Sequence, residues 1–241
     1  MRNDDSILKE LQNSLASIDG SLCVLDTTLS VDKQMEYFRY MEKIRESDLN
    51  LTAEEQVAIL QSDDTSLKEK KILMAAMAIS GDVKAYRALE NYGEEVQDKE
   101  LKEWASLSLA QAKITLEFEF SGEKKIFIST GLGGKGTKLR YYAFFKSNRL
   151  KVFSDYQRDL IEKEFLYSIN KSQGIVEEIK IEDNYFNILF LLDFQADVKY
   201  SLARAIEECN QYGDFINDHF IITNVKVFDK EDIRRELQRN G

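Results

Sequence analysis

The sequence predicts an α+β protein, with a helical N-terminal half packed on a βαββαβ C-terminal half. Helix signals run almost without interruption to about residue 120, and the hydrophobic period changes after Lys124. Charge is also unevenly placed. Residues 1–122 carry 14 basic and 24 acidic side chains and residues 123–241 carry 19 of each, so the net charge of −10 lies in the first half. We therefore expect an acidic helical domain over 1–122 and an α+β domain over 123–241.

The first half contains short amphipathic helices with sequence-encoded starts, the first of them over "SILKELQNSLASI" (6–18). Thr52 and Ser66 each open a capping box with a glutamate three residues later. Short helices joined by short loops form antiparallel pairs. The segment "ITLEFEF" (114–120) alternates like a strand but continues a helix without a break, so we predict a helix to about Phe120.

The stretch "SLKEKKILMAAMAISGDVKAYRALENYG" (66–93) resembles one HEAT-type repeat. Its "ISGD" turn, between an apolar helix and the "AYRALENY" helix, carries the resemblance, which covers about residues 50–115. The resemblance implies a HEAT-like region that displays a surface for protein binding and performs no chemistry. An ordinary helical bundle is the alternative.

In the second half, strands and helices alternate from Leu139 in the order β-α-β-β-α-β, which resembles the ferredoxin-like fold. The strands "KLRYYAFFK" (138–146) and "YFNILFLLDF" (185–194) are the most aromatic, as expected for the two central strands. Tyr142 and Phe144 lie on one side of the first strand, and Tyr141 and Phe145 lie on the other. The face that the two helices leave open should therefore be covered by the helical half, by a partner or by stacked bases.

The stretch "GLGGKGTK" (131–138) is rich in glycine and lies in a segment, Lys124 to Lys151, with eight basic residues and no acidic one. Lys135 is followed by Gly136, so the stretch is not a Walker A loop, and it leads into a strand, unlike a dinucleotide-binding loop. Glycine amides and nearby cations can still bind an anion. The candidate anion-binding residues are Gly131, Gly133, Gly134, Lys135, Gly136, Thr137, Lys138 and Arg140. A flexible hairpin and a protein-docking loop are the alternatives.

Residues for catalysis are sparse. The chain has one histidine, His219, and two distant cysteines, Cys23 and Cys209, without metal-ligand spacing. We therefore expect no catalytic residue, no metal site and no cofactor. Aromatic residues on the first and third strands are typical of RNA-binding sheets, but the third strand lacks their basic and glycine residues, and the overall acidity argues against nucleic acid.

These observations favour a non-enzymatic cytoplasmic adaptor or regulatory protein-interaction module, with a protein partner or self-association. The alternative is a phosphate-ligand or nucleic-acid binding protein that uses the basic loop 131–140. The polar N-terminus "MRNDDSILKELQNSL" lacks the features of a signal peptide, and no apolar stretch approaches the roughly 18 residues of a membrane helix, so no membrane contact is expected.

Overall fold

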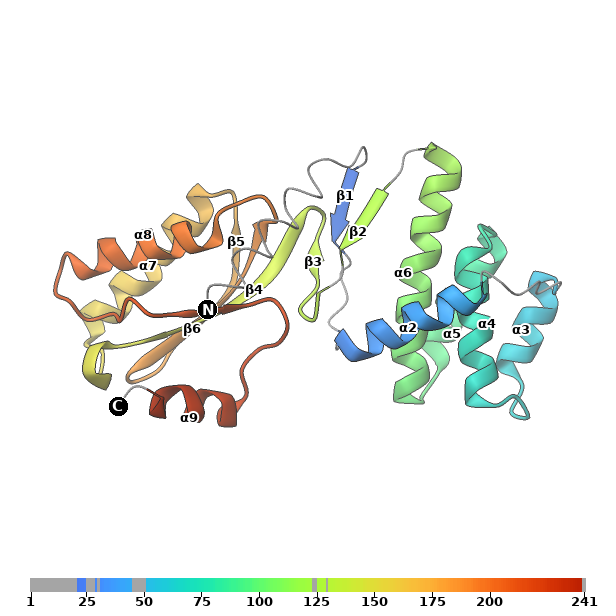
Figure 1. Cartoon of the computed structure of the whole chain (residues 1–241), viewed down its shortest axis with the longest axis horizontal. Coiled ribbons are helices and arrows are strands. Elements are labelled where there is room, and N and C mark those ends of the chain that lie inside the picture. The colour runs from blue at the N-terminus through green and yellow to red at the C-terminus, as the bar shows by residue number, and fades with distance from the viewer. Residues whose placement is uncertain are drawn as a thin grey trace. The chain divides into compact units, whose positions relative to one another are not determined.

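The computed structural model describes residues 21–24, 29, 31–44, 51–122, 125–128 and 130–239. The described residues before and after Ser129 form two compact units, one helical and one with a five-stranded sheet (Figure 1). The predicted α+β class is confirmed. The predicted domain boundary at 122/123 stays a prediction, and the predicted first helix over 6–18 lies outside the described residues.

The first unit contains a two-stranded parallel sheet and a group of helices that pack on one another. Its elements are β1 (Ser21–Val24), α2 (Val31–Ile44), α3 (Ala53–Gln61), α4 (Leu67–Ile79), α5 (Val83–Glu95), α6 (Lys99–Ser121) and β2 (Lys125–Ile128). The predicted capping boxes are present at Thr52 and Ser66. As predicted, α6 continues through "ITLEFEF" and ends at Gly122, whose φ of 67° suits glycine. Residues two positions apart point in different directions around a helix, so the alternating apolar residues of this segment do not share one face. Phe120 is accordingly 78% exposed.

A buried lysine ties three helices of this unit together. Lys71 of α4 is 4% exposed, and its ammonium donates to Glu100 of α6 at 2.6 Å and to Glu36 of α2 at 3.1 Å. The ammonium also lies 4.4 Å from the ring centroid of Trp104, whose Nε1 donates to the Lys71 carbonyl oxygen. Burial lowers the pKa of Lys71, but its bonds to Glu100 and Glu36 outweigh burial and the pKa lies above its usual value.

We predict that Lys71→Ala lowers the free energy of unfolding by about 2–3 kcal/mol, because it removes a buried ion pair and its contact with Trp104. The loss stays moderate because both carboxylates are about half exposed and can regain water. Lys84→Ala is the matched control, since its pair with Glu54 is exposed and should contribute little. Equal urea midpoints for the two variants would contradict this account.

The second unit is built on an antiparallel sheet with the strand order β7-β4-β6-β5 and the short β3 beside β4. Its elements are β3 (Gly134–Lys135), β4 (Lys138–Lys146), the 3-10 turn η1 (Asn148–Leu150), α7 (Asp155–Lys171), β5 (Ile175–Ile181), β6 (Tyr185–Asp193), α8 (Val198–Asn210), β7 (Ile221–Thr223) and α9 (Lys230–Gln238). From β4 to β7 the elements follow in the predicted order β-α-β-β-α-β. The central strands β4 and β6 pair over their full length.

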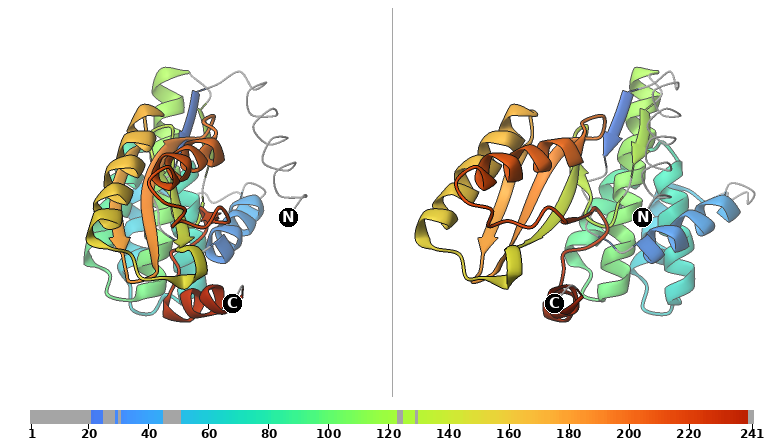
Figure 2. Two further views of the ribbon diagram at one scale, coloured as in Figure 1. Left: turned by 90° about the vertical axis from the view of Figure 1, so that its left-hand side faces the viewer. Right: turned by 60° about the vertical axis from the view of Figure 1, so that its left-hand side comes forward.

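One face of this sheet is covered by α7 and α8, which lie side by side on it (Figure 2). Phe145 of β4 stacks on Phe186 of β6, and Phe165 of α7 contacts both rings edge-on at 4.9 and 5.1 Å between centroids. These three side chains are at most 1% exposed. They form the main core of the unit, on the face predicted for Tyr141 and Phe145.

The other face is covered by the chain's own C-terminal segment. Tyr142 and Phe144 are each 1% exposed and pack with Phe228, and with Ile233 and Leu237 of α9. In Figure 1, α9 lies across the sheet from α7 and α8. The expectation that this face needs the helical half, a partner or bases is corrected, because the terminal helix predicted after the last strand folds back on it.

We predict that a fragment of residues 130–241 unfolds cooperatively in urea on its own, since both sheet faces are covered by elements of this unit. A fragment of residues 130–227 should self-associate, because it exposes the Tyr142 and Phe144 face. Size-exclusion chromatography with light scattering distinguishes the two outcomes. A monomeric, folded 130–227 fragment would contradict the importance of α9 as a cover.

Candidate functional site

The predicted anion loop is a β-hairpin. Lys135 of β3 pairs with Lys138 of β4 across a two-residue turn, Gly136-Thr137, and Gly136 adopts a φ of 62°. Gly133 has a φ of 66°. Gly131 is needed for space, since a Cβ on it would lie 1.9 Å from the carbonyl oxygen of Val225. The positive φ of Gly133 and Gly136 and the close approach at Gly131 explain these three glycines structurally.

Several charged and polar side chains of the hairpin bind other parts of the same unit. Arg140 forms a two-pronged ion pair with Glu177 of β5 at 2.6 and 2.9 Å and also donates to the Leu132 carbonyl oxygen. Lys138 donates to the Gln173 carbonyl oxygen at 2.6 Å, and Thr137 donates to Asp193 at 2.8 Å. Lys135 is exposed at the tip.

Backbone amides near the hairpin are also used internally. The amides of Leu132, Gly133 and Arg140 donate to the carbonyl oxygens of Asn224, Thr130 and Gly133. The structure therefore gathers all eight predicted residues in one hairpin, with Lys138 and Arg140 directed to protein acceptors. Anion binding by this loop stays a prediction, and Lys135 is its most accessible cation.

We predict that Gly131→Ala lowers the free energy of unfolding by about 2–3 kcal/mol, because the new methyl group would overlap the backbone at Val225. Gly136→Ala should cost only about 1 kcal/mol, since its Cβ would meet no atom within 4 Å and only the positive φ is unfavourable. Urea unfolding of both variants checks the difference. Gly136→Ala costing as much as Gly131→Ala would be inconsistent with this assignment.

A group of exposed cations in this unit lies on and beside α9, and the sequence analysis did not identify it. We call this surface the basic face; it consists of Lys226, Lys230, Arg234, Arg235 and Arg239. All five residues are exposed, and the side chains of Arg235 and Arg239 are 65% and 75% exposed. The signal was available, since "IRRELQR" places basic residues at spacings of one, four and five along a helix.

The basic face is held in place by the start of α9. Asp229 caps the helix and forms a capping box with Asp232. The side chain of Asp232 is 11% exposed and binds Lys226 at 2.6 Å and Arg235 at 3.3 Å. The bond from Lys226 is the main cause that lowers the pKa of Asp232. Asp232 thus orients two of the cations, and among the described residues no ion pair forms at Arg234.

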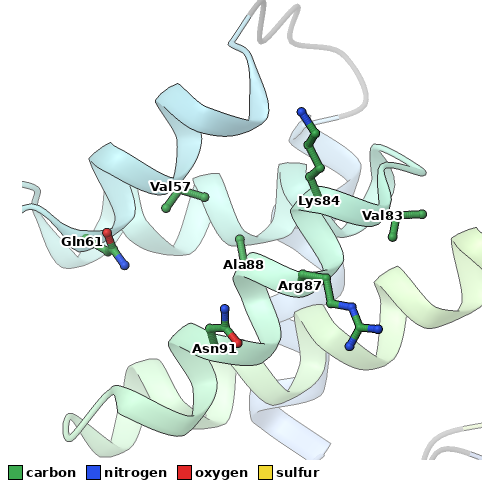
Figure 3. A pocket seen from close by; sticks show the side chains of 7 residues that line it. All are labelled: Val57, Gln61, Val83, Lys84, Arg87, Ala88 and Asn91. Carbon is green, nitrogen blue, oxygen red and sulfur yellow. The ribbon is translucent and has the colours of Figure 1, made fainter.

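The helical unit has an open groove of about 350 Å³ between α3 and α5 (Figure 3). Val57 and Gln61 come from α3, and Lys84, Arg87 and Asn91 are among the lining residues of α5 (Figure 3). Lys84 is paired with Glu54 at 2.9 Å, and Arg87 is paired with Glu90 at 2.8 Å. Both cations of the groove are therefore paired with carboxylates, as are Lys226, Arg235 and Arg239 of the basic face. Among the described residues no ion pair forms at Lys230 or Arg234, so the basic face is the better anion candidate.

Groups for catalysis are dispersed in the described part of the chain. His219 is exposed, and its backbone amide donates to Asn217. Cys209 is buried, and burial raises the pKa of its thiol to about 12. Over the described ranges, no three His, Cys, Asp or Glu side chains are grouped so that they could hold a metal ion. None of the helices in those ranges has the length and apolar character needed to cross a membrane.

No protein-family model matches the chain, and no curated protein matches it either. Solved structures do match. One is described as a putative transposase from Deinococcus radiodurans R1, with 13% identity and a TM-score of 0.38, over 42% of this chain and 90% of that one. Another is the REP-associated tyrosine transposase bound to a REP hairpin, with 8% identity and a TM-score of 0.32, over 41% of this chain and 61% of that one.

These descriptions correct several predictions. Both neighbours are described as transposases and one is bound to a hairpin, so the predictions of a non-enzymatic, HEAT-like protein-binding adaptor and of an unlikely role for nucleic acid are wrong against this comparison. The matches leave the resemblance to HEAT-type repeats itself untested. At these identities and TM-scores the likeness carries no argument about what this chain binds, and the case below rests on its own side chains.

Proposed function

We propose that the α+β unit binds nucleic acid through the sugar–phosphate backbone, and that the basic face on α9 makes the contacts. The observation that supports this proposal is the set of five exposed cations on and beside α9, in a chain whose net charge is −10. The same stretch, 226–239, also holds four carboxylates (Asp229, Glu231, Asp232 and Glu236), so its net charge is +1. Phosphate contacts by Lys and Arg supply most of the affinity in sequence-independent binding.

The arrangement of side chains suits a phosphate backbone better than a single small anion. Lys230 and Arg234 are one helical turn apart, as are Arg235 and Arg239, so the cations extend along α9. Arg235 and Arg239 each bind one carboxylate and keep most of their side chain exposed. Arginine donates in a fork that fits phosphate oxygens.

The predicted loop has a smaller share in this proposal. Lys135, exposed at the hairpin tip, is a further candidate for a phosphate contact, whereas Arg140 and Lys138 hold the hairpin to β5 and to the turn before it. The base of the hairpin lies beside the basic face, since Leu132 donates to the Asn224 carbonyl oxygen and Gly131 abuts Val225. We also propose a cytoplasmic location, as expected for a chain with two distant cysteines.

We predict that Arg234→Ala with Arg235→Ala weakens binding of a 20-base-pair DNA about tenfold and lowers the slope of log affinity against log salt by about 2, because two phosphate contacts are lost. Fluorescence anisotropy across a salt series measures both quantities.

Arg204→Ala is the matched control, because Arg204 is an exposed arginine on α8, in the layer on the other side of the sheet. It should leave affinity and salt slope unchanged. The proposal fails if the wild type binds no nucleic acid at low salt, or if the double variant and the control weaken binding equally.

A further inference from the structure

The helix α9 covers one face of the sheet but leaves two polar groups of that face without a well-matched partner. Lys146 is 9% exposed, and its ammonium donates to the Glu236 carbonyl oxygen at 3.0 Å, a neutral acceptor. The hydroxyl of Tyr142 is buried without a hydrogen-bond partner among the described residues. A buried cation and a buried donor of this kind favour a more polar, anionic occupant.

The aromatic side chains of this face already pack against one further aromatic ring, that of Phe228. The Phe228 ring lies with its centroid 5.1 Å from that of Tyr142 and 5.9 Å from that of Phe144, at tilts of 47° and 40°. Tyr185 of β6 lies 5.5 Å from Phe144. Tyr142 and Phe144 are two residues apart on β4, about 7 Å along the strand, which suits successive unstacked bases.

The cover itself is weakly held. Of the nine residues of α9, only Ile233 and Leu237 join the apolar cluster on the sheet, and the rest of the helix is mainly charged. Few buried apolar contacts are typical of segments that open locally at low free-energy cost. The segment from Phe228 to Leu237 can therefore exchange with a ligand more readily than α7 or α8.

We propose that the sheet face under α9 is a site for single-stranded nucleic acid. Bases replace Phe228 against Tyr142 and Phe144, and a phosphate replaces the Glu236 carbonyl at Lys146. This inference rests on the proposed function, since it assumes that the α+β unit binds nucleic acid, and it adds a second site that opens when α9 is displaced. Binding in wild type is weakened by the fraction of time for which α9 stays closed.

The test uses the full chain and a fluorescein-labelled 12-nucleotide single-stranded DNA, with a 12-base-pair duplex as the comparison. Phe228→Ala should tighten single-strand binding about fivefold or more, because it loosens the cover, and should leave duplex binding unchanged. Val227→Ala is the matched control, since Val227 is 51% exposed beside the ring and should change neither affinity. Adding Lys146→Met to Phe228→Ala should abolish the gain.

Hydrogen exchange on the wild type provides a second readout that needs no variant to fold. Saturating single-stranded DNA should speed exchange of the α9 amides, such as Ile233, which donates to the Asp229 carbonyl oxygen in the closed helix. Slower exchange of these amides, or unchanged single-strand affinity in a folded Phe228→Ala variant, would overturn the second site. Either result would leave the proposal for the basic face standing. A wild type that binds neither DNA would instead overturn the proposed function.

Discussion

The structure of the α+β unit depends on covering the second face of its sheet. Strands β4 and β6 are apolar on both sides, and α7 and α8 bury one side only. Tyr142 and Phe144 would otherwise expose two large aromatic side chains next to each other. After β7 the chain returns across the sheet, and Phe228 and α9 cover this face.

The path of that return explains features far from α9 in sequence. The segment after β7 passes so close to the hairpin that residue 131 has no room for a side chain, and Leu132 adds to the same apolar cluster. Lys146, at the far end of β4, bonds to the last turn of α9. The glycine-rich stretch thus has a structural role in this unit.

The same return places opposite chemistry on the two sides of one short helix. Ile233 and Leu237 face the sheet, while Lys230, Arg234, Arg235 and Arg239 face outward. A helix that is apolar on only two positions covers the aromatic face with little free energy to spare. The outward side can therefore contact a phosphate backbone while the inward side covers the sheet.

Much of the fold could be predicted from the sequence, because its signals are local. Capping boxes at Thr52 and Ser66, the helix through Phe120 and the order of elements after Leu139 follow from side-chain period and turn chemistry. The site could be predicted less well, because partners of a side chain are non-local. Nothing local in the sequence shows that Arg140 pairs with Glu177, 37 residues away. Nor does any local pattern show that the terminal helix covers an aromatic sheet face.

The central claim is that nucleic acid meets this protein at the C-terminal segment of the α+β unit. Backbone NMR of the full chain, titrated with the 12-nucleotide single strand, tests it most directly. The account predicts that the largest chemical-shift changes fall between residues 226 and 239 and on Tyr142, Phe144 and Lys146. Changes confined to α2–α6, or the absence of changes at saturating DNA, would contradict it.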